Sequence, residues 1–507
     1  MLKSRDMSSR KTIHEAGAMT MKRLMLVWMM ILCLVPLGVW AEEEASEPLF
    51  PAMGENEKWG YINRGGEFVI APQFDYAQEF RGNYAVVTVY PNGFTPSEDM
   101  NWTDMPDCQG IIERCGNLVL EAAYSFDAGY DERYYGGKHT GIWYVTRRSD
   151  LVWDENEEEI LQENSVGFFD IPSGCFSGLN WREIWPWVSD SRLIPVMDDT
   201  YRAGYADRAT SELVIPCLYF STDPSVFQEG VAPVAYEDEE GDASEFFLID
   251  ETGADIPLPE GIHAIYGHGA SGGRIAITDD EKLLGFADLQ GHVVIEPQFT
   301  YVGSFSEGFA EVQFPEQDWG IIDREGTILT RGIIAQHWSG PHFNNGYRTE
   351  KTGANTYSLL DMQGETVFSL TIDHIVSLDT PMENGLCWFA VDEKGDETHW
   401  HERRYGLVNL QGDIITDAKW IKPDFSSYSE DYHIVVQMID GERKLGYLDN
   451  SGTLAVPCIF DDASDFENGL AFVRIGSRCG YIDKDGQEVY FWESEEEPDF
   501  NESDEEE

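Results

Sequence analysis

Large apolar and polar side chains alternate along short runs of this chain, and the runs recur in one repeated order. The clearest example is the stretch from Gly285 to Gly320, whose runs are separated by turn residues such as glycine and proline. Alternation with a period of two is typical of half-buried β-strands, and regularly spaced short strands with turn signals indicate an all-β protein. The pattern therefore predicts an all-β chain.

One unit of the pattern predicts a hairpin followed by a further strand. In the stretch that begins at Gly285, Asp288 is followed three residues later by Gly291. A carboxylate that caps the turn and a glycine with positive φ suit a tight hairpin. Pro297 is expected to end the second strand, because proline has no N–H for the ladder. The loop that ends at Gly308 then leads into a third strand from Phe309 to Phe314.

The chain contains about eleven copies of this unit, which start about 35 to 55 residues apart. Glycines within the first strand of a copy are expected to lie under packed aromatic rings. The copies begin at Trp59, Gln109, Val166, Ala203, Phe246, Gly285, Trp319, Tyr357, Tyr405, Leu445 and Cys479. The structural motif residues are Trp59, Gly60, Gly65, Gly285, Asp288, Gly291, Trp319, Gly320, Asp323, Gly326, Gly406, Gly446, Asp449, Gly452, Gly480, Asp483 and Gly486.

This repeated phrase resembles the WG (KWG) repeat family of bacterial proteins. The first, sixth, seventh and tenth copies match it closely, whereas the second, third, fifth and eighth have lost the tryptophan or the glycine. The resemblance implies an exported β-repeat protein, and it brings no catalytic residues to transfer.

The two ends of the array suggest how the strands are grouped. Residues 49–53 precede Trp59 much as residues 309–313 precede Trp319, so each unit is expected to read strand, hairpin, strand, strand. No spare strand then remains to join the chain ends, and eleven units exceed the roughly four to eight blades of a single propeller. We expect an open, curved, solenoid-like array. The alternative is two propeller-like rings.

The array is expected to cover residues 42–492, with other segments at both ends and within it. Residues 1–41 form an N-terminal extension and a signal peptide, in which Lys22 and Arg23 precede an apolar run and Ala41 ends a small-residue cleavage site. An uncleaved membrane anchor is the alternative. Residues 147–164 are predicted to be an acidic loop or short helix, residues 390–404 a charged insertion, and residues 493–507 a disordered acidic tail.

Charge restricts the partners of the chain. The formal net charge is −59, with 93 acidic and 34 basic residues. Such a surface repels nucleic acid and anionic membranes, and favours cationic partners or divalent ions. The acidic runs could bind Ca²⁺ loosely, but the chain has no calcium-loop motif, and no cofactor or metal ligand is predicted.

Cysteines give no evidence of a disulfide framework. Seven remain after the signal, at Cys108, Cys115, Cys175, Cys217, Cys387, Cys458 and Cys479. An odd number excludes complete pairing within one chain. Cys217, Cys458 and Cys479 occupy apolar positions of the repeat, so buried free thiols are expected there, and a local bridge between Cys108 and Cys115 is also considered.

Three other clusters have the residue types of functional sites. Trp181, Trp185 and Trp187 are ligand-contact candidates because exposed aromatic rings stack on sugars, although filling a gap in the irregular third copy is the favoured interpretation. Residues 269–273 match the nucleophile-elbow pattern, but they lie in a loop of the repeat and not between a strand and a helix. His399 and His401 are two potential metal ligands without a third, which favours a solvated insertion.

We therefore expect an exported, monomeric, non-enzymatic repeat protein at the cell surface, in the periplasm or outside the cell. Its surface would bind another macromolecule, either a protein or a cell-wall glycan. Membrane contact is expected only through an uncleaved signal. The alternatives are a carbohydrate-active or other hydrolase with a site at the centre of a propeller, and a purely structural surface spacer.

Overall fold

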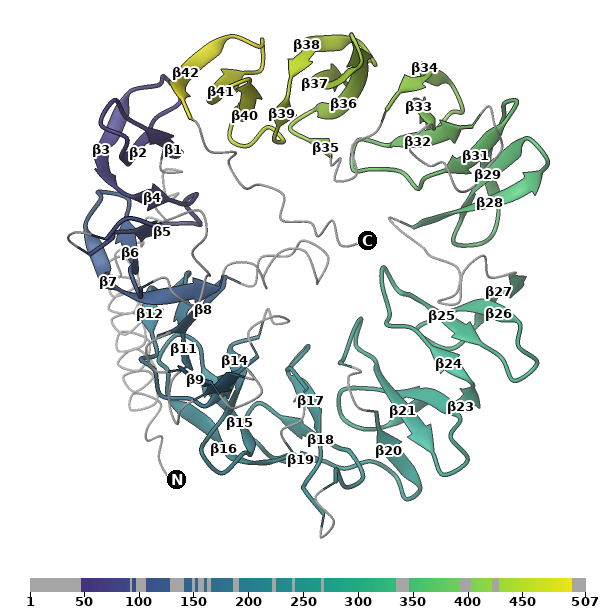
Figure 1. Ribbon diagram of the computed structural model, residues 1–507. Helices are drawn as coiled ribbons and strands as arrows, with labels where there is room; N and C mark the ends of the chain where they lie inside the picture. Colours follow the sequence, from purple (N-terminus) through teal and green to yellow (C-terminus); the bar gives the residue numbers. More distant parts are fainter. Residues whose placement is uncertain are drawn as a thin grey trace, which may run out of the picture. The chain divides into compact units, whose positions relative to one another are not determined.

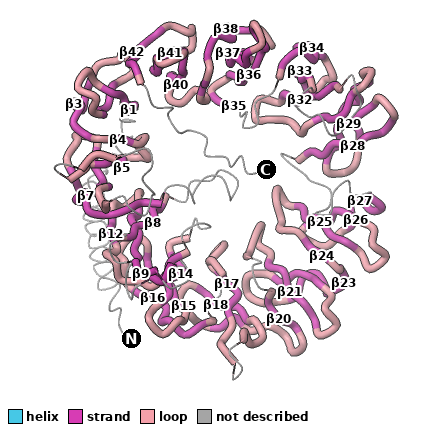
Figure 2. Tube along the Cα trace, in the orientation of Figure 1, coloured by secondary structure: helices cyan, strands magenta, loops and turns pink. Residues whose placement is uncertain are grey.

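The computed structural model describes fourteen segments of the chain. They are residues 47–91, 94–96, 106–127, 141–147, 151–153, 159–161, 166–185, 191–220, 225–238, 242–265, 269–333, 346–392, 403–421 and 428–494. The predicted signal peptide lies outside them. Every regular element in the described segments is a β-strand (Figure 2), and none of them holds a helix suited in length and hydropathy to crossing a membrane.

The strands are short and follow one another in small sheets (Figure 1). The first five copies contain β1 (Phe50–Met53), β2 (Trp59–Ile62), β3 (Phe68–Phe74), β4 (Tyr76–Ala77), β5 (Tyr84–Thr88), β6 (Gln109–Glu113), β7 (Leu118–Asp127), β8 (Ile142–Thr146), β9 (Leu151–Trp153), β10 (Glu159–Leu161), β11 (Val166–Asp170), β12 (Cys175–Phe176), β13 (Glu183–Ile184), β14 (Leu193–Met197), β15 (Ala203–Asp207), β16 (Leu213–Tyr219), β17 (Val231–Val234), β18 (Phe247–Asp250) and β19 (Asp255–Ile256).

The sixth to eleventh copies contain β20 (Ile262–Ala264), β21 (Ile275–Asp279), β22 (Leu284–Ala287), β23 (Val293–Phe299), β24 (Tyr301–Val302), β25 (Phe309–Gln313), β26 (Trp319–Asp323), β27 (Ile328–Ile333), β28 (Tyr347–Gly353), β29 (Thr356–Asp361), β30 (Thr366–Thr371), β31 (Ile375–Leu378), β32 (Leu386–Val391), β33 (Arg404–Asn409), β34 (Ile414–Trp420), β35 (Tyr428–Ser429), β36 (Tyr432–Ile439), β37 (Glu442–Asp449), β38 (Leu454–Phe460), β39 (Asp462–Ala463), β40 (Leu470–Ile475), β41 (Arg478–Asp483) and β42 (Glu488–Glu493).

The predicted all-β tandem array is confirmed. Six copies are antiparallel meanders of four strands, such as β20-β21-β22-β23 or β39-β40-β41-β42, and three have three described strands: β1-β2-β3, β17-β18-β19 and β28-β29-β30. The second and third copies are joined in one seven-stranded sheet through pairing of β7 with β8. The predicted strand before Trp59 is also confirmed, because β1 pairs with β2 as β25 pairs with β26. The repeat phrase is thus the central hairpin of each sheet with its flanking strands.

The tight turn after the first strand of the phrase has the predicted chemistry. In the sixth copy, one Asp288 carboxylate oxygen accepts the backbone N–H groups of Gln290 and His292, both at 2.9 Å. Gly291 has a φ of 83°, in the left-handed region that glycine adopts without steric cost. In the first copy the turn glycine with positive φ is Gly66, with a φ of 78°. Our prediction of Gly65 for the motif is therefore off by one residue.

Proline in the second strand of the hairpin does not end that strand, contrary to our prediction. Pro297 lies within β23, opposite Gly285. The register between β22 and β23 shifts on both sides of Phe286, which accommodates the extra residues as a bulge. A Cβ at Gly285 would lie 2.4 Å from the Ile295 carbonyl oxygen and 2.7 Å from the Pro297 nitrogen. Glycine is therefore required in the first strand because the bulged backbone of the second strand presses against it.

The predicted aromatic cover over these glycines is partly correct. A Cβ at Gly320, Gly406 or Gly480 would meet both a backbone carbonyl of the following strand and an aromatic ring. At Gly60 the closest atoms all belong to the backbone from Ile70 to Pro72. The close approach of backbone is thus the feature that all four positions share.

Each sheet buries its apolar faces against the sheets of the neighbouring copies. One recurring device is a buried tyrosine of the phrase whose hydroxyl donates to a backbone carbonyl of the next copy. Tyr61 donates to Gln78, Tyr205 to Ser225 and Tyr447 to Ser464, at 2.7 to 2.8 Å. The core is accordingly a series of interfaces between copies rather than one central cluster.

The first and last sheets also pack against each other. Phe50, Ala52 and Ile62 of the first copy share a buried cluster with Phe472 and Tyr481 of the eleventh. The Tyr481 hydroxyl donates to the Pro51 carbonyl at 3.0 Å, and the Tyr490 hydroxyl donates to the Met53 carbonyl at 2.9 Å. These contacts were not expected for an open array, whose terminal sheets would each have one face without a neighbour. They arise because the first and last sheets pack face to face, which requires no additional strand to pair the two chain ends.

The insertions and cysteines differ in part from expectation. The insertion at residues 147–164, predicted as a loop or short helix, contains the β9–β10 hairpin. Most of the insertion at residues 390–404 and residues 495–507 of the tail lie outside the described residues. None of the seven cysteines in the described segments forms a disulfide, so Cys108 and Cys115 are not bridged. Cys458 and Cys479 are buried as predicted, whereas Cys217, for which burial was also expected, is only half-buried.

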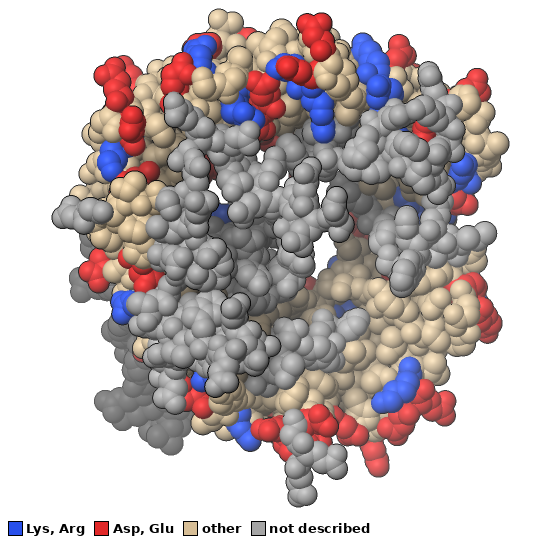
Figure 3. Space-filling model, viewed as in Figure 1, with Lys and Arg blue, Asp and Glu red and all other residues tan. Residues whose placement is uncertain are grey.

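Most acidic side chains of the described segments lie on the outside of the sheets, with buried exceptions such as Asp170 and Asp207. Figure 3 shows them distributed over the described parts of the face in view, with fewer basic side chains between them. The apolar residues, by contrast, fill the interfaces between copies. Within the described segments, most acidic side chains therefore occupy solvent-exposed positions of the repeat.

Candidate functional site

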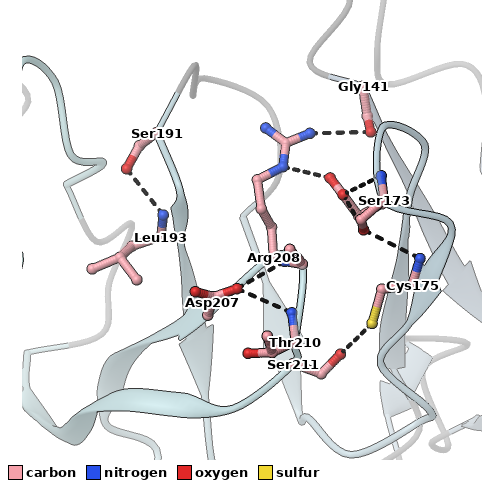
Figure 4. Close-up of polar contacts among 11 residues, drawn as sticks. Gly141, Ser173, Cys175, Ser191, Leu193, Asp207, Arg208, Thr210 and Ser211 are labelled. Atoms are coloured by element: carbon pink, nitrogen blue, oxygen red, sulfur yellow. Dashed lines mark hydrogen bonds and ion pairs between the residues drawn. The ribbon is translucent and has the colours of Figure 1, made fainter. Parts of the chain in front are cut away.

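A polar cluster in the irregular third copy surrounds Asp170, at the end of β11. Figure 4 shows Arg208 and Ser173 of this cluster. The Asp170 carboxylate is only 2% exposed and forms an ion pair with Arg208, which is 13% exposed and comes from the turn of the fourth copy. Ser173 donates its backbone N–H to the same carboxylate at 3.0 Å. The Arg208 guanidinium also donates to the Gly141 carbonyl at 3.1 Å. One arginine therefore joins two loops of the third copy to the fourth.

A second set of contacts extends this cluster within the fourth copy. Asp207 accepts the backbone N–H groups of Ala209 at 2.9 Å and Thr210 at 3.0 Å, and it pairs with Arg192. Burial opposes ionisation of Asp207, but these hydrogen bonds and the Arg192 charge outweigh it and lower the pKa of the carboxyl group. Cys175 and Ser211 approach within 3.3 Å between sulfur and oxygen (Figure 4).

These contacts hold the loops of the two copies in place, and they lack the arrangement of a catalytic serine or cysteine. The Asp170 carboxylate is engaged by Arg208 and Ser173, and neither Ser173 nor Cys175 is hydrogen-bonded to a histidine. A serine or thiol nucleophile needs a base within hydrogen-bond reach. We conclude that the Asp170–Arg208 cluster holds the third and fourth copies of the repeat together.

The sequence contains a pattern that indicates this connection between copies, and our predictions did not include it. Arg208 directly follows Asp207 of the tight turn, and basic residues occupy the same position in other copies. Arg64 donates to the Asn468 carbonyl at 2.7 Å, and Lys484 donates to the Glu430 carbonyl at 3.0 Å. Each of these residues reaches the preceding copy, with the first copy reaching the eleventh. A basic residue after the turn aspartate or asparagine is thus an additional element of the repeat.

A second polar cluster lies between the ninth and tenth copies, around His433. This side chain is 1% exposed and occupies the position in β36 that Ala471 holds in β40. Asn384 donates to its Nε2 atom at 3.2 Å, and its Nδ1 atom has no hydrogen-bond partner. Trp388 and Tyr428 pack against the ring. Burial lowers the pKa of His433 to about 4, although the nearby Asn450 side chain acts in the opposite direction.

Replacing His433 by glutamine is expected to reduce the acid sensitivity of folding. The folded pKa of about 4 lies below the ordinary value of 6.5, so the unfolded chain takes up the proton first as the pH falls. Stability contributed by neutral His433 is full above pH 6.5 and is lost toward pH 4. As the pH falls between these limits, the free energy of unfolding of the wild type should decrease by roughly 2 to 3 kcal/mol more than that of His433→Gln.

Urea unfolding at pH 7 and pH 4.5 measures this difference. Carboxylates that titrate in the same range are common to both proteins and cancel in the comparison. Equal losses in wild type and variant would show that His433 does not stay neutral in the folded state.

The structure separates the three tryptophan candidates of the sequence. Trp181 is buried in the cluster between the third and fourth copies, with Val166 and Ile184. Trp185 is half-buried, and Trp187 lies outside the described residues. Trp181 therefore fills the interface, as the favoured interpretation expected, and only Trp185 offers a described ring with partial exposure. A glycan contact there stays a prediction.

The two other sequence patterns supply no described active or metal site. Ser271 lies in a tight turn whose Gly272 and Gly273 have positive φ, and β21 follows instead of a helix. The Ser271 hydroxyl donates to the Phe305 carbonyl of the next copy. His399 and His401 lie outside the described residues. Within the described segments, no three histidine, cysteine or acidic side chains form a group that could hold a metal ion.

Comparison with known proteins identifies the repeat. A family model described as "WG containing repeat" matches residues 59–89, 285–314 and 446–479, which lie in the first, sixth and tenth copies. No curated protein matches the sequence.

Two solved structures have low similarity to the chain. The structure titled "Crystal structure of the eukaryotic initiation factor" has 7% identity and a TM-score of 0.35, covering 73% of this chain and 94% of the other. BamB from Moraxella catarrhalis has 12% identity and a TM-score of 0.28, covering 60% of this chain and 94% of its own. Neither score is high enough to support an argument about role.

Proposed function

We propose that this chain, three copies of which match a model of the WG repeat, is an exported, non-enzymatic scaffold whose acidic surface binds a cationic macromolecule. The observation that carries the proposal is the separation of the two residue classes. Apolar side chains fill the interfaces between copies, whereas most acidic side chains of the described segments lie at exposed positions outside these interfaces. A surface of one charge attracts partners of the other and repels like-charged ones.

The internal contacts of the repeat support this assignment. Turn aspartates such as Asp288 and Asp449 are occupied by backbone N–H groups of their own hairpins. These aspartates stabilise the hairpins, so residues at the other exposed positions can differ between copies without changing the core. The predicted signal peptide at residues 21–41 supports export. The hydrolase and spacer alternatives have no observation of their own in their favour.

Binding of the mature chain from residue 42 to basic proteins and to peptidoglycan tests the proposal. We expect capture of basic proteins that weakens as NaCl is raised through physiological ionic strength, because exposed charges are screened. A variant lacking residues 495–507 is the control, and it should retain binding if the array carries the interaction. Failure to capture any basic protein at low salt would refute the proposal. Binding of peptidoglycan alone, in the presence of Ca²⁺, would favour the glycan partner instead.

A further inference from the structure

The eighth copy lacks the glycine and proline that shape the outer strand elsewhere. Ser358 stands where the sixth copy has Gly285, and Leu370 stands where it has Pro297. The pairing of β29 with β30 accordingly runs in regular register from Thr356↔Thr371 to Leu359↔Phe368, with one shift near its end. In the sixth copy the corresponding pairing shifts twice. The outer strand of the eighth copy is thus less bulged than its counterparts with proline.

Hydroxyl groups connect the strands of this sheet across its face. The buried Ser358 hydroxyl lies 2.8 Å from the hydroxyl oxygens of both Thr352 and Ser369. The Thr356 and Thr371 hydroxyl oxygens lie 3.0 Å apart. A serine side chain fits here because no bulged carbonyl presses against this position. These contacts keep β30 aligned with β29 along nearly its whole length.

The free edge of β30 lacks the usual protection against strand addition. Its sequence, Thr-Val-Phe-Ser-Leu-Thr, contains no proline and no charge, and no described strand pairs with its outer side. Charges, prolines and bulges normally prevent an exposed edge from pairing with another chain. Among the other last strands of the repeat sheets, the two-residue β12 (Cys175–Phe176) carries neither a proline nor a charge. The remaining ones carry them as follows: Pro72 in β3, Pro216 in β16, Asp255 in β19, Pro297 in β23, Arg331 in β27, Asp417 and Lys419 in β34, Pro457 in β38, and Glu488 and Glu493 in β42.

We propose that the outer edge of β30 accepts an extended segment of a partner protein as an additional strand. The segment would carry basic residues at its ends, because the exposed Glu365 and Asp373 flank the uncharged strand. A second copy of this chain is disfavoured, since two molecules of net charge −59 repel each other. Strand addition provides backbone hydrogen bonds for affinity and side-chain contacts for specificity. This inference rests on the proposed function and names the position at which it acts.

Two matched substitutions distinguish this edge from the general acidity of the chain. Val367 in β30 and Val294 in β23 occupy equivalent positions, and their exposures are 38% and 37%. The probe is a fluorescein-labelled peptide of alternating threonine and valine with two lysines at each end. V367K should weaken its binding to the mature chain about fivefold, since like charges on adjacent strands repel. V294K and V367E should change the affinity by less than about twofold.

Hydrogen exchange locates the bound peptide independently. Amide exchange in residues 366–371 should slow when the peptide binds, with no change in β23. Equal weakening by V367K and V294K, or no slowing in β30, would overturn the inference. If basic proteins are still captured in that case, the proposed function stands without it. A concentration-dependent dimer that both V367K and V367E abolish, with no peptide binding, would show that a second copy occupies the edge.

Discussion

Replacing Arg208 by methionine is expected to lower the free energy of unfolding by about 3 to 5 kcal/mol. The change leaves the Asp170 carboxylate buried without its cationic partner and removes the bond to the Gly141 carbonyl. Urea titration followed by tryptophan fluorescence measures the loss. The double variant Asp170→Asn with Arg208→Met should recover part of it, because no unpaired charge then remains in the interface.

The Arg202–Glu237 pair provides a matched control for this experiment. It also joins two copies, but both side chains are exposed, so Arg202→Met should cost less than about 1 kcal/mol. Similar losses in Arg208→Met and Arg202→Met would contradict the interpretation that burial makes the Asp170–Arg208 pair important for stability.

Replacing Phe50 by alanine is expected to destabilise the far end of the chain as well as its own. Phe50 is buried against Tyr481, with ring centroids 5.4 Å apart, and removal of a buried phenylalanine typically costs about 3 to 5 kcal/mol. Amide exchange should therefore accelerate in residues 470–493, which are more than four hundred positions away in sequence. Peptide-resolved hydrogen exchange measures this effect directly.

Phe305→Ala is the control, since Phe305 is equally buried in the interface between the sixth and seventh copies. Its loss of stability should be similar, with faster exchange in β21 to β26 and little change in residues 470–493. If Phe50→Ala leaves exchange in residues 470–493 unchanged, the first and last sheets do not stabilise each other in solution.

Local features of the repeat were predictable from the sequence because neighbours within one hairpin determine them. Asp288 and Gly291 are three residues apart, and their turn depends only on backbone conformation and hydrogen bonds within that turn. The strand before Trp59 could likewise be predicted, because the similar residues before Trp319 have the pattern of a strand. The match of the family model to three copies agrees with this reading.

The errors arose where residues interact across strands or across copies. Pro297 was expected to end a strand because the sequence does not show that β23 bulges against Gly285. The hydroxyl contacts of Ser358 and the exposed edge of β30 depend on the same register. Neither can be derived from alternation of apolar and polar residues alone, since that pattern defines strands but not their pairing.

The sequence by itself determined that this protein is an acidic, all-β array of one repeated hairpin, because side-chain period and turn chemistry are local properties. Only the tertiary structure decided which copies touch. It placed Arg208 on Asp170, surrounded His433 with residues of two copies, and brought Phe50 against Tyr481. These contacts depend on how successive sheets pack face to face, and residues far apart in the chain meet there without any shared pattern in the sequence.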